Sequence, residues 1–382
     1  MLRLPKQYFS ALPLMVRCIA ACWLITKLLC HKLWLADRLF PLVPVHDILY
    51  EVPNNIHFFL FAVMLISLAA LMIFPQKKWI CTVMIIAEIV SCMLDQNRWQ
   101  PWEYQFTFML VVYIALTDQA RIILCWQIIF IGIYFFSGIN KLNHGFILQV
   151  WHTRILKQMF GISLQNVWLY RLGWLLPLFE ISGAVALIFY RTRKTGVIML
   201  CAMHIFIFFM IEPVRLHFKG VIGPWNILMP MLLIGLFFKL SFNISGIKKR
   251  HYMSGCIILF WWVLPWLHFI GRWDSYFSSS LYSGKVQYLY VCTSNQNTRK
   301  LFSEDLVHNR NAAPCDTMLS VFNWSMRELN TSPNGETRVF KKIITQWQSK
   351  FDSTRSDQFF VHFPKFTKQK WIEIDSSMSV IK

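Results

Sequence analysis

Long apolar runs alternate with short polar gaps along most of the chain. Runs of about the length that a bilayer requires cover residues 9–29, 56–74, 79–94, 106–116, 122–139, 168–190, 196–212, 221–238 and 253–270. The run at 106–116 is short for a membrane span. This pattern predicts an all-α polytopic membrane bundle of about nine transmembrane helices.

Basic residues in alternate gaps predict the orientation of the bundle. Four short basic gaps lie at residues 77–78, 121, 191–194 and 239–250. The positive-inside tendency places them, and with them the amino terminus, in the cytoplasm, and an odd number of spans leaves the carboxy terminus outside. The first run carries Arg17 and Lys27 and lacks a small-residue cleavage site, so we expect it to remain as a helix. The outer gaps are basic too, for example at Arg154, which either anchors lipid phosphates or helps to form a basic mouth for an anionic substrate or lipid head group.

The composition changes after about residue 274, where long apolar runs end. Alternating patterns predict strands at 286–292 and 359–363, a helix at 316–329, and a strand followed by a helix within 337–351. We therefore expect a transmembrane domain over residues 1–274 and a small extracytoplasmic α/β domain over 275–382. Cys292 and Cys315 fall in this second part and could form a disulfide if it lies outside the cytosol, which the sequence leaves open.

Composition supports a membrane protein and excludes two other classes of function. Hydrophobic residues make up 56% of the chain and charged residues 15%, too few to solvate a soluble protein of this size. The net charge is +19, but the basic residues lie in scattered gaps rather than in one stripe beside a nucleic-acid-reading motif. The ten cysteines include no C-x-x-C pair and no His/Cys cluster at zinc spacing, so we expect no metal.

Several ionisable residues stand where hydrocarbon is expected. Four carboxyl groups fall within or at the edges of apolar runs, namely Glu88, Asp95, Glu180 and Glu212. Because a carboxylate in hydrocarbon is costly, these groups should face the bundle interior, pair with a cation or stay protonated. Glu180 precedes a Ser and a Gly that would let another helix approach closely. His204 lies in mid-span, where a hydrogen-bonded packing residue is the alternative to a site residue.

Lys141 follows the apolar run 122–139 directly, with only Asn140 between them. Its amine is therefore expected near the membrane boundary. A lysine at such a position usually extends to the head groups as an anchor. Backed by hydrocarbon and close to water, the same amine can instead act as a general base.

Three ordered segments resemble the membrane domain of vitamin K-dependent γ-glutamyl carboxylase and its bacterial relatives, the horizontally transferred transmembrane (HTTM) family. The first segment contains Leu94, Asp95, Trp99 and Tyr104, and the second contains Tyr134, Phe135, Gly138, Lys141 and Leu142. The third contains Glu180, Ser182, the basic turn 191–194 and His204. The resemblance covers roughly residues 10–240.

The resemblance implies a site that opens on the lumenal or periplasmic side. In the carboxylase, the lysine at the position of Lys141 deprotonates vitamin K hydroquinone. Reaction with oxygen then gives a stronger base that removes a γ-proton from glutamate, and CO2 adds to the carbanion. A histidine implicated in the carboxylation stands in that family where this chain has Trp102. The resemblance therefore implies quinol oxygenation here more than the full carboxylase (lyase) reaction.

We accordingly expect an integral protein of a bacterial inner membrane, in contact with lipids, with Lys141 as the base and a reduced quinone of the vitamin K or menaquinone type as cofactor. The expected binding residues are Asp95, Trp99, Trp102, Tyr104, Asn140, Arg154, Glu180 and His204. The alternative is a non-catalytic membrane scaffold that positions the carboxy-terminal domain for a protein partner in the cell envelope. A transporter is less favoured, because the two halves show no paired broken helices or inverted repeat.

Overall fold

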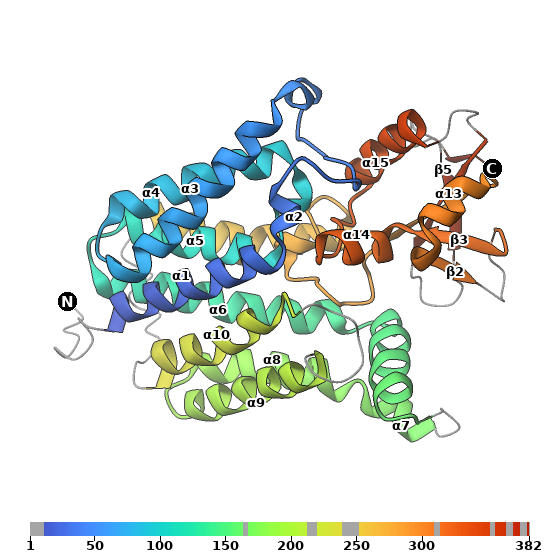
Figure 1. Cartoon of the computed structure of the whole chain (residues 1–382). Coiled ribbons are helices and arrows are strands. Elements are labelled where there is room, and N and C mark those ends of the chain that lie inside the picture. Colours follow the sequence, from blue (N-terminus) through green and yellow to red (C-terminus); the bar gives the residue numbers. More distant parts are fainter. Residues whose placement is uncertain are drawn as a thin grey trace.

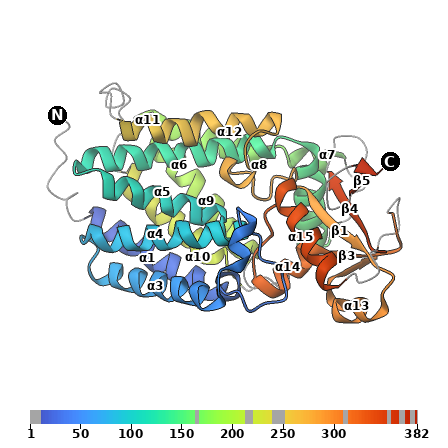
Figure 2. The ribbon, with the colours of Figure 1, turned by 90° about the horizontal axis from the view of Figure 1, so that it is seen from above.

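A computed structural model of the chain describes residues 11–162, 167–211, 220–238, 252–308, 314–351, 356–363, 370–374 and 380–381. Glu212 and the basic gap at 239–250 lie outside the described residues. Long helices run side by side through most of the molecule, and a mixed sheet-and-helix part covers one end of them (Figures 1 and 2).

The apolar runs of the sequence form the helical bundle. Its helices are α1 (Ala11–Leu29), α3 (Asn54–Ile73), α4 (Lys78–Leu94), α5 (Pro101–Ala115), α6 (Gln119–Lys141), α7 (Val167–Leu172), α8 (Leu175–Ile188), α9 (Arg193–Ile211), α10 (Gly223–Leu233), α11 (Tyr252–Ile258) and α12 (Leu264–Leu267). The π-helical segments among the described residues are η4 (Phe146–Met159), η5 (Ile234–Phe238) and η7 (Leu259–Val263). Segment η5 extends α10, and η7 joins α11 to α12. Short helical turns are α2 (His31–Trp34), η2 (Asp47–Glu51), η3 (Gln96–Arg98), η8 (His268–Ile270) and η9 (Tyr276–Ser278).

Five helical segments among the described residues are long and apolar enough to cross a membrane. They are Ala11–Leu29, Asn54–Ile73, Gln119–Lys141, Trp168–Ile188 and Tyr252–Ile270. Each overlaps a run that the sequence predicts as a span. Helix α6 is the central one, because 83% of its most apolar stretch is buried inside the protein, whereas the same share of Asn54–Ile73 is 33%. The apolar surface of the outer helices thus remains free to face lipid.

The carboxy-terminal part contains a six-stranded antiparallel sheet with strand order β2-β3-β1-β4-β5-β6. Its strands are β1 (Tyr288–Cys292), β2 (Leu306–His308), β3 (Thr317–Ser320), β4 (Gln358–Phe363), β5 (Lys370–Ile374) and β6 (Val380–Ile381). The helices α13 (Gln296–Leu301), α14 (Val321–Leu329) and α15 (Thr337–Lys350) accompany it. Trp324 of α14 and Trp347 of α15 are fully buried, with ring centroids 5.8 Å apart. Cys292 and Cys315 form a disulfide.

Two local expectations for this part differ from the structure. Residues 316–329 are not one helix, because Leu319 and Ser320 pair with β1 before α14 begins. Residues 337–351 contain no strand, because Val339, Ile343 and Trp347 recur at the spacing of one helix face and are all buried in α15. The expected strands at 286–292 and 359–363 correspond to β1 and β4.

Side chains of the carboxy-terminal part bind the end of the bundle directly. The carboxylate of Glu328 accepts hydrogen bonds from the backbone N–H groups of Leu39 and Phe40. The ring of Phe40 packs 4.8 Å from that of Trp324, and Arg338 donates to Gln96 at 2.7 Å. These contacts hold the sheet-containing part against the bundle.

Candidate active site

A mostly apolar cavity of about 220 Å3 lies between α5, α6, α8, α9 and α10, beneath residues 276–282. Its volume exceeds by more than tenfold the roughly 10–15 Å3 that a single water molecule needs. The apolar wall includes Ile133, Phe146, Phe179, Met203, Ile207 and Trp261. A space of this size and lining suits an apolar ligand with a few polar atoms.

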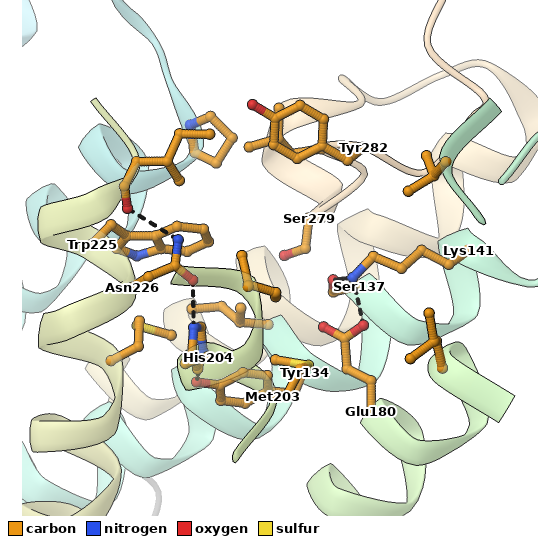
Figure 3. A pocket seen from close by; sticks show the side chains of 18 of the residues that line it. Tyr134, Ser137, Lys141, Glu180, Met203, His204, Trp225, Asn226, Ser279 and Tyr282 are labelled. Atoms are coloured by element: carbon orange, nitrogen blue, oxygen red, sulfur yellow. Dashed lines mark hydrogen bonds and ion pairs between the residues drawn. The ribbon is translucent and has the colours of Figure 1, made fainter. Parts of the chain in front are cut away.

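At one end of the cavity, Lys141 of α6 meets Glu180 of α8 (Figure 3). The Nζ atom of Lys141 lies 2.5 Å from Oε2 of Glu180 and donates a hydrogen bond to Oγ of Ser137 at 2.8 Å. The Lys141 side chain is 15% exposed and that of Glu180 is 4% exposed. This carboxylate, placed by the sequence in an apolar run, is thus paired with a cation as expected.

A glycine allows the two helices to approach closely enough for this ion pair. A Cβ atom at Gly138 would lie 2.6 Å from Cγ1 of Ile181 and 2.9 Å from the carbonyl oxygen of Pro177, both in α8. The absence of a side chain at position 138 lets α8 lie against α6 one turn before Lys141. Gly183 has the same role toward α9, because a Cβ there would meet Leu200 at 2.8 Å.

A second polar group in the cavity wall is built around His204 of α9. Its Nε2 atom lies 2.7 Å from the hydroxyl of Tyr134, and its Nδ1 atom lies 2.8 Å from Oδ1 of Asn226. All three residues line the cavity, and all three are buried. Figure 3 shows them on a part of the wall separate from Lys141 and Glu180.

Tyr104 of α5 adds a hydroxyl that has no hydrogen-bond partner within the described structure. Its ring stacks between Trp261 and Phe277, with centroid distances of 4.8 and 4.5 Å, and its side chain lines the cavity. An unpaired buried hydroxyl costs free energy. A polar atom of a bound ligand would satisfy it.

Residues from the start of the carboxy-terminal part form the roof of the cavity. Tyr276, Ser279 and Tyr282 line it, and the guanidinium of Arg154 stands 5.7 Å from the centroid of the Tyr282 ring. Burial raises the pKa of Tyr282 to about 12, so its phenol stays protonated near neutral pH. Ser279 and Tyr282 have φ angles of 55° and 56°, a left-handed conformation that is rare for a bulky residue and recurs at ligand-binding sites.

Five of the nine residues predicted from the sequence line this cavity. They are Tyr104, Lys141, Arg154, Glu180 and His204. The other four, Asp95, Trp99, Trp102 and Asn140, are absent from its wall.

These four residues have structural partners instead. Asp95 pairs with Arg38, and the indole of Trp102 donates to Oε1 of Glu103 at 3.0 Å. The ring of Trp99 packs 5.7 Å from that of Phe277. The Asn140 amide donates to the carbonyl of Ser278 at 2.7 Å, so it joins α6 to the roof.

Tyr134 and Asn226 line the cavity but are not among the binding residues predicted from the sequence. Tyr134 belongs to the Tyr-Phe-x-x-Gly-x-x-Lys-Leu segment, where its spacing of seven residues from Lys141 places both on one helix face. That spacing is a usable signal. Nothing local marks Asn226, because its partner His204 lies 22 residues earlier on another helix.

A second cluster of buried charges lies away from the cavity. Lys27 of α1 contacts Glu88 of α4 at 2.7 Å and Glu103 of α5 at 3.0 Å, and the indole of Trp23 also donates to Glu103. Buried Arg98, whose side chain donates to backbone carbonyls and to Ser91, stands nearby and supplies a further positive charge. The cluster joins three helices, and Lys27, Glu88 and Glu103 are not among the residues that line the cavity described above.

Comparisons of the chain with protein-family models, with curated proteins and with solved structures find no match.

Proposed function

We propose that this protein is a multi-pass membrane enzyme that takes up a quinol-type substrate and uses Lys141, together with Glu180, to accept a proton from a substrate hydroxyl. The observation that supports this best is the position of the Lys141–Glu180 pair in the wall of a ligand-sized apolar cavity. A lysine that only anchored a helix would extend its amine to the head groups. Here the amine is held inside, beside a carboxylate.

The pair can hold a proton in two ways. With the proton on Nζ, the two residues form an ion pair. With the proton on Glu180, both are neutral, and the free amine can accept a proton from a ligand hydroxyl beside it. The proposal therefore requires the arrangement with the proton on Glu180 when the ligand hydroxyl approaches the amine.

The cavity residues fit a reduced quinone. The apolar wall suits a ring and its hydrocarbon chain, and the unpaired hydroxyl of Tyr104 suits a ring oxygen. When bound, a reduced quinone supplies hydroxyl groups and the electrons for reaction with oxygen. The chain orients it, excludes water through the roof residues Ser279 and Tyr282, and holds its proton at Lys141 and Glu180.

We limit the proposal to quinol oxygenation and leave out glutamate carboxylation. The resemblance to the carboxylase family places a histidine at the position of Trp102. That tryptophan is buried outside the cavity and bonded to Glu103. We infer that the carboxylation half of the reaction has no counterpart at this position.

We further propose nine membrane passes, with the cavity mouth and the sheet outside the cytoplasm of a bacterial inner membrane. Besides the five long apolar segments, α4, α5, α9 and α10 with η5 would supply the remaining passes. The Cys292–Cys315 disulfide supports an oxidising compartment. The scaffold alternative gains no specific support from the described residues. Ser279 and Tyr282, at the start of the sheet-containing part, line the cavity roof.

The test is aerobic turnover of chemically reduced vitamin K or menaquinone by the purified protein, with the quinone epoxide as the measured product. We expect wild type to form epoxide and Lys141→Ala to lose about 100-fold or more, which is the usual contribution of a general base. Lys77→Ala, which removes an exposed lysine just before α4, is the control and should be unchanged. No epoxide from wild type, or equal rates for wild type and Lys141→Ala, would overturn the proposal.

A further inference from the structure

The hydrogen bonds around Asn226 fix which nitrogen of His204 carries its proton. The Nδ2 group of Asn226 donates to the carbonyl oxygen of Ile222 at 3.0 Å, so this amide can be oriented in only one way. Its Oδ1 atom must then face Nδ1 of His204, 2.8 Å away, and accept a hydrogen bond from it. A neutral imidazole with its proton on Nδ1 has an unprotonated Nε2.

The same argument determines whether the hydroxyl of Tyr134 donates or accepts in its hydrogen bond with His204. Because Nε2 of His204 can only accept, the hydroxyl of Tyr134 spends its single proton on that hydrogen bond, at 2.7 Å. The Tyr134 oxygen retains a lone pair and no donor. Tyr134 lines the cavity, and the hydrogen-bonding capacity that remains at its oxygen is that of an acceptor.

Tyr134 and Lys141 are two polar points on one wall. Both belong to α6 and line the same cavity, and they are separated by seven residues, about 10 Å along a helix. Lys141 and Glu180 at one point can both donate and accept. Tyr134 at the other point only accepts.

We propose that Tyr134 is a positioning residue that accepts a hydrogen bond from a hydroxyl of the cavity ligand. His204 and Asn226 determine that the Tyr134 oxygen is an acceptor there. This inference rests on the proposed function and extends it. It assigns a role to Tyr134 and Asn226, which lie outside the Lys141–Glu180 pair. It also predicts that the site prefers a ring hydroxyl to a ring carbonyl at the Tyr134 end.

The test compares two ring compounds of the same skeleton, 1,4-dihydroxynaphthalene and 1,4-naphthoquinone, under anaerobic conditions. Binding is measured by saturable quenching of tryptophan fluorescence, since Trp225 and Trp261 lie in the cavity wall. We expect wild type to bind the diol at least tenfold more tightly than the quinone. In Tyr134→Phe this ratio should fall at least fivefold.

Asn226→Leu provides a second, independent change. Without Oδ1, His204 can move its proton to Nε2 and donate to Tyr134, which frees the phenol to donate to a carbonyl. The ratio should then fall toward one or invert, a result that loss of packing alone would not give. The matched control is Tyr113→Phe, which removes a hydroxyl of a buried residue that donates to the carbonyl oxygen of Pro75 and is not among the cavity-lining residues, and which should leave the ratio unchanged.

The outcomes separate this inference from the proposed function. Suppose that wild type binds the diol and that Tyr134→Phe keeps the wild-type ratio, with a thermal unfolding transition that shows the variant to be folded. Tyr134 is then a packing residue, and the inference is wrong while the proposed function stands. If Asn226→Leu unfolds, Tyr134→Phe and its Tyr113→Phe control decide the matter. If neither compound binds to wild type, both the inference and the proposed function fail.

Discussion

At the residue scale, Glu328 shows how one carboxylate can join two parts of the chain. It accepts hydrogen bonds from the backbone of Leu39 and Phe40 and, at 2.7 Å, from the indole of Trp324. Hydrogen bonds to an ionised acceptor contribute about 1.5–3 kcal/mol each, and backbone donors left without a partner cost a similar amount. The energy of this contact therefore depends on the charge as well as the shape of the side chain.

We expect Glu328→Gln to lower the free energy of unfolding of the purified protein by about 1–3 kcal/mol, because an amide has one acceptor oxygen and no charge. Thermal unfolding in detergent measures the change. Glu304→Gln, an exposed carboxylate 3.8 Å from Arg327, is the control and should change stability little. Equal effects of the two substitutions would show that Glu328 does not hold the parts together.

The sequence predicts individual charges better than it predicts their partners. Lys141 and Glu180 stand out because an ionisable group in an apolar run must find a partner. Asp95 stands out for the same reason, yet its partner is Arg38, away from the cavity. Burial follows from local pattern, whereas the choice between a structural pair and a site depends on which helices become neighbours.

At the scale of elements, the contact between α6 and α8 sets the geometry of the site. Gly138 is the residue that permits it, since a Cβ there would overlap Ile181 and Pro177 of α8. Gly255 of α11 has nothing within 4 Å of the same added atom, so it offers the matched comparison.

Gly138→Ala should destabilise the protein by about 1–3 kcal/mol through overpacking and should reduce turnover by moving Lys141 away from Glu180. Gly255→Ala should be neutral or slightly stabilising, because alanine is the better helix former. Thermal unfolding and epoxide formation measure the two effects. A Gly138→Ala protein with wild-type stability and turnover would contradict the close approach of these helices.

Element type is well predicted in the bundle and less well beyond it. An apolar run of bilayer length satisfies its backbone hydrogen bonds best as a helix, and five of the expected spans coincide with helical segments long and apolar enough to cross a membrane. The run at 316–329 is short enough to form either a helix or a strand, and the pairing of Leu319 with Val291 makes its first residues a strand. That pairing joins residues far apart in sequence, which local periodicity does not report.

At the scale of the whole molecule, the cavity belongs to the bundle and to the sheet-containing part together. The bundle supplies Lys141, Glu180 and the His204 group, and residues 276–282 close the space above them. The sequence predicts two parts from the change in composition near residue 274. It gives no sign that the second part supplies a wall of the site, because the roof contacts join residues more than a hundred positions apart, such as Arg154 and Tyr282.

The position of a bound quinol would test the role of Lys141 most directly. A cryo-electron microscopy structure of the protein in lipid nanodiscs, prepared anaerobically with excess reduced menaquinone, would locate it. We expect ring density in the cavity between α6, α8 and α10, with one ring oxygen within hydrogen-bond distance of Nζ of Lys141. An empty cavity at saturating quinol, or density bound elsewhere while Lys141 stays closed on Glu180, would contradict this expectation.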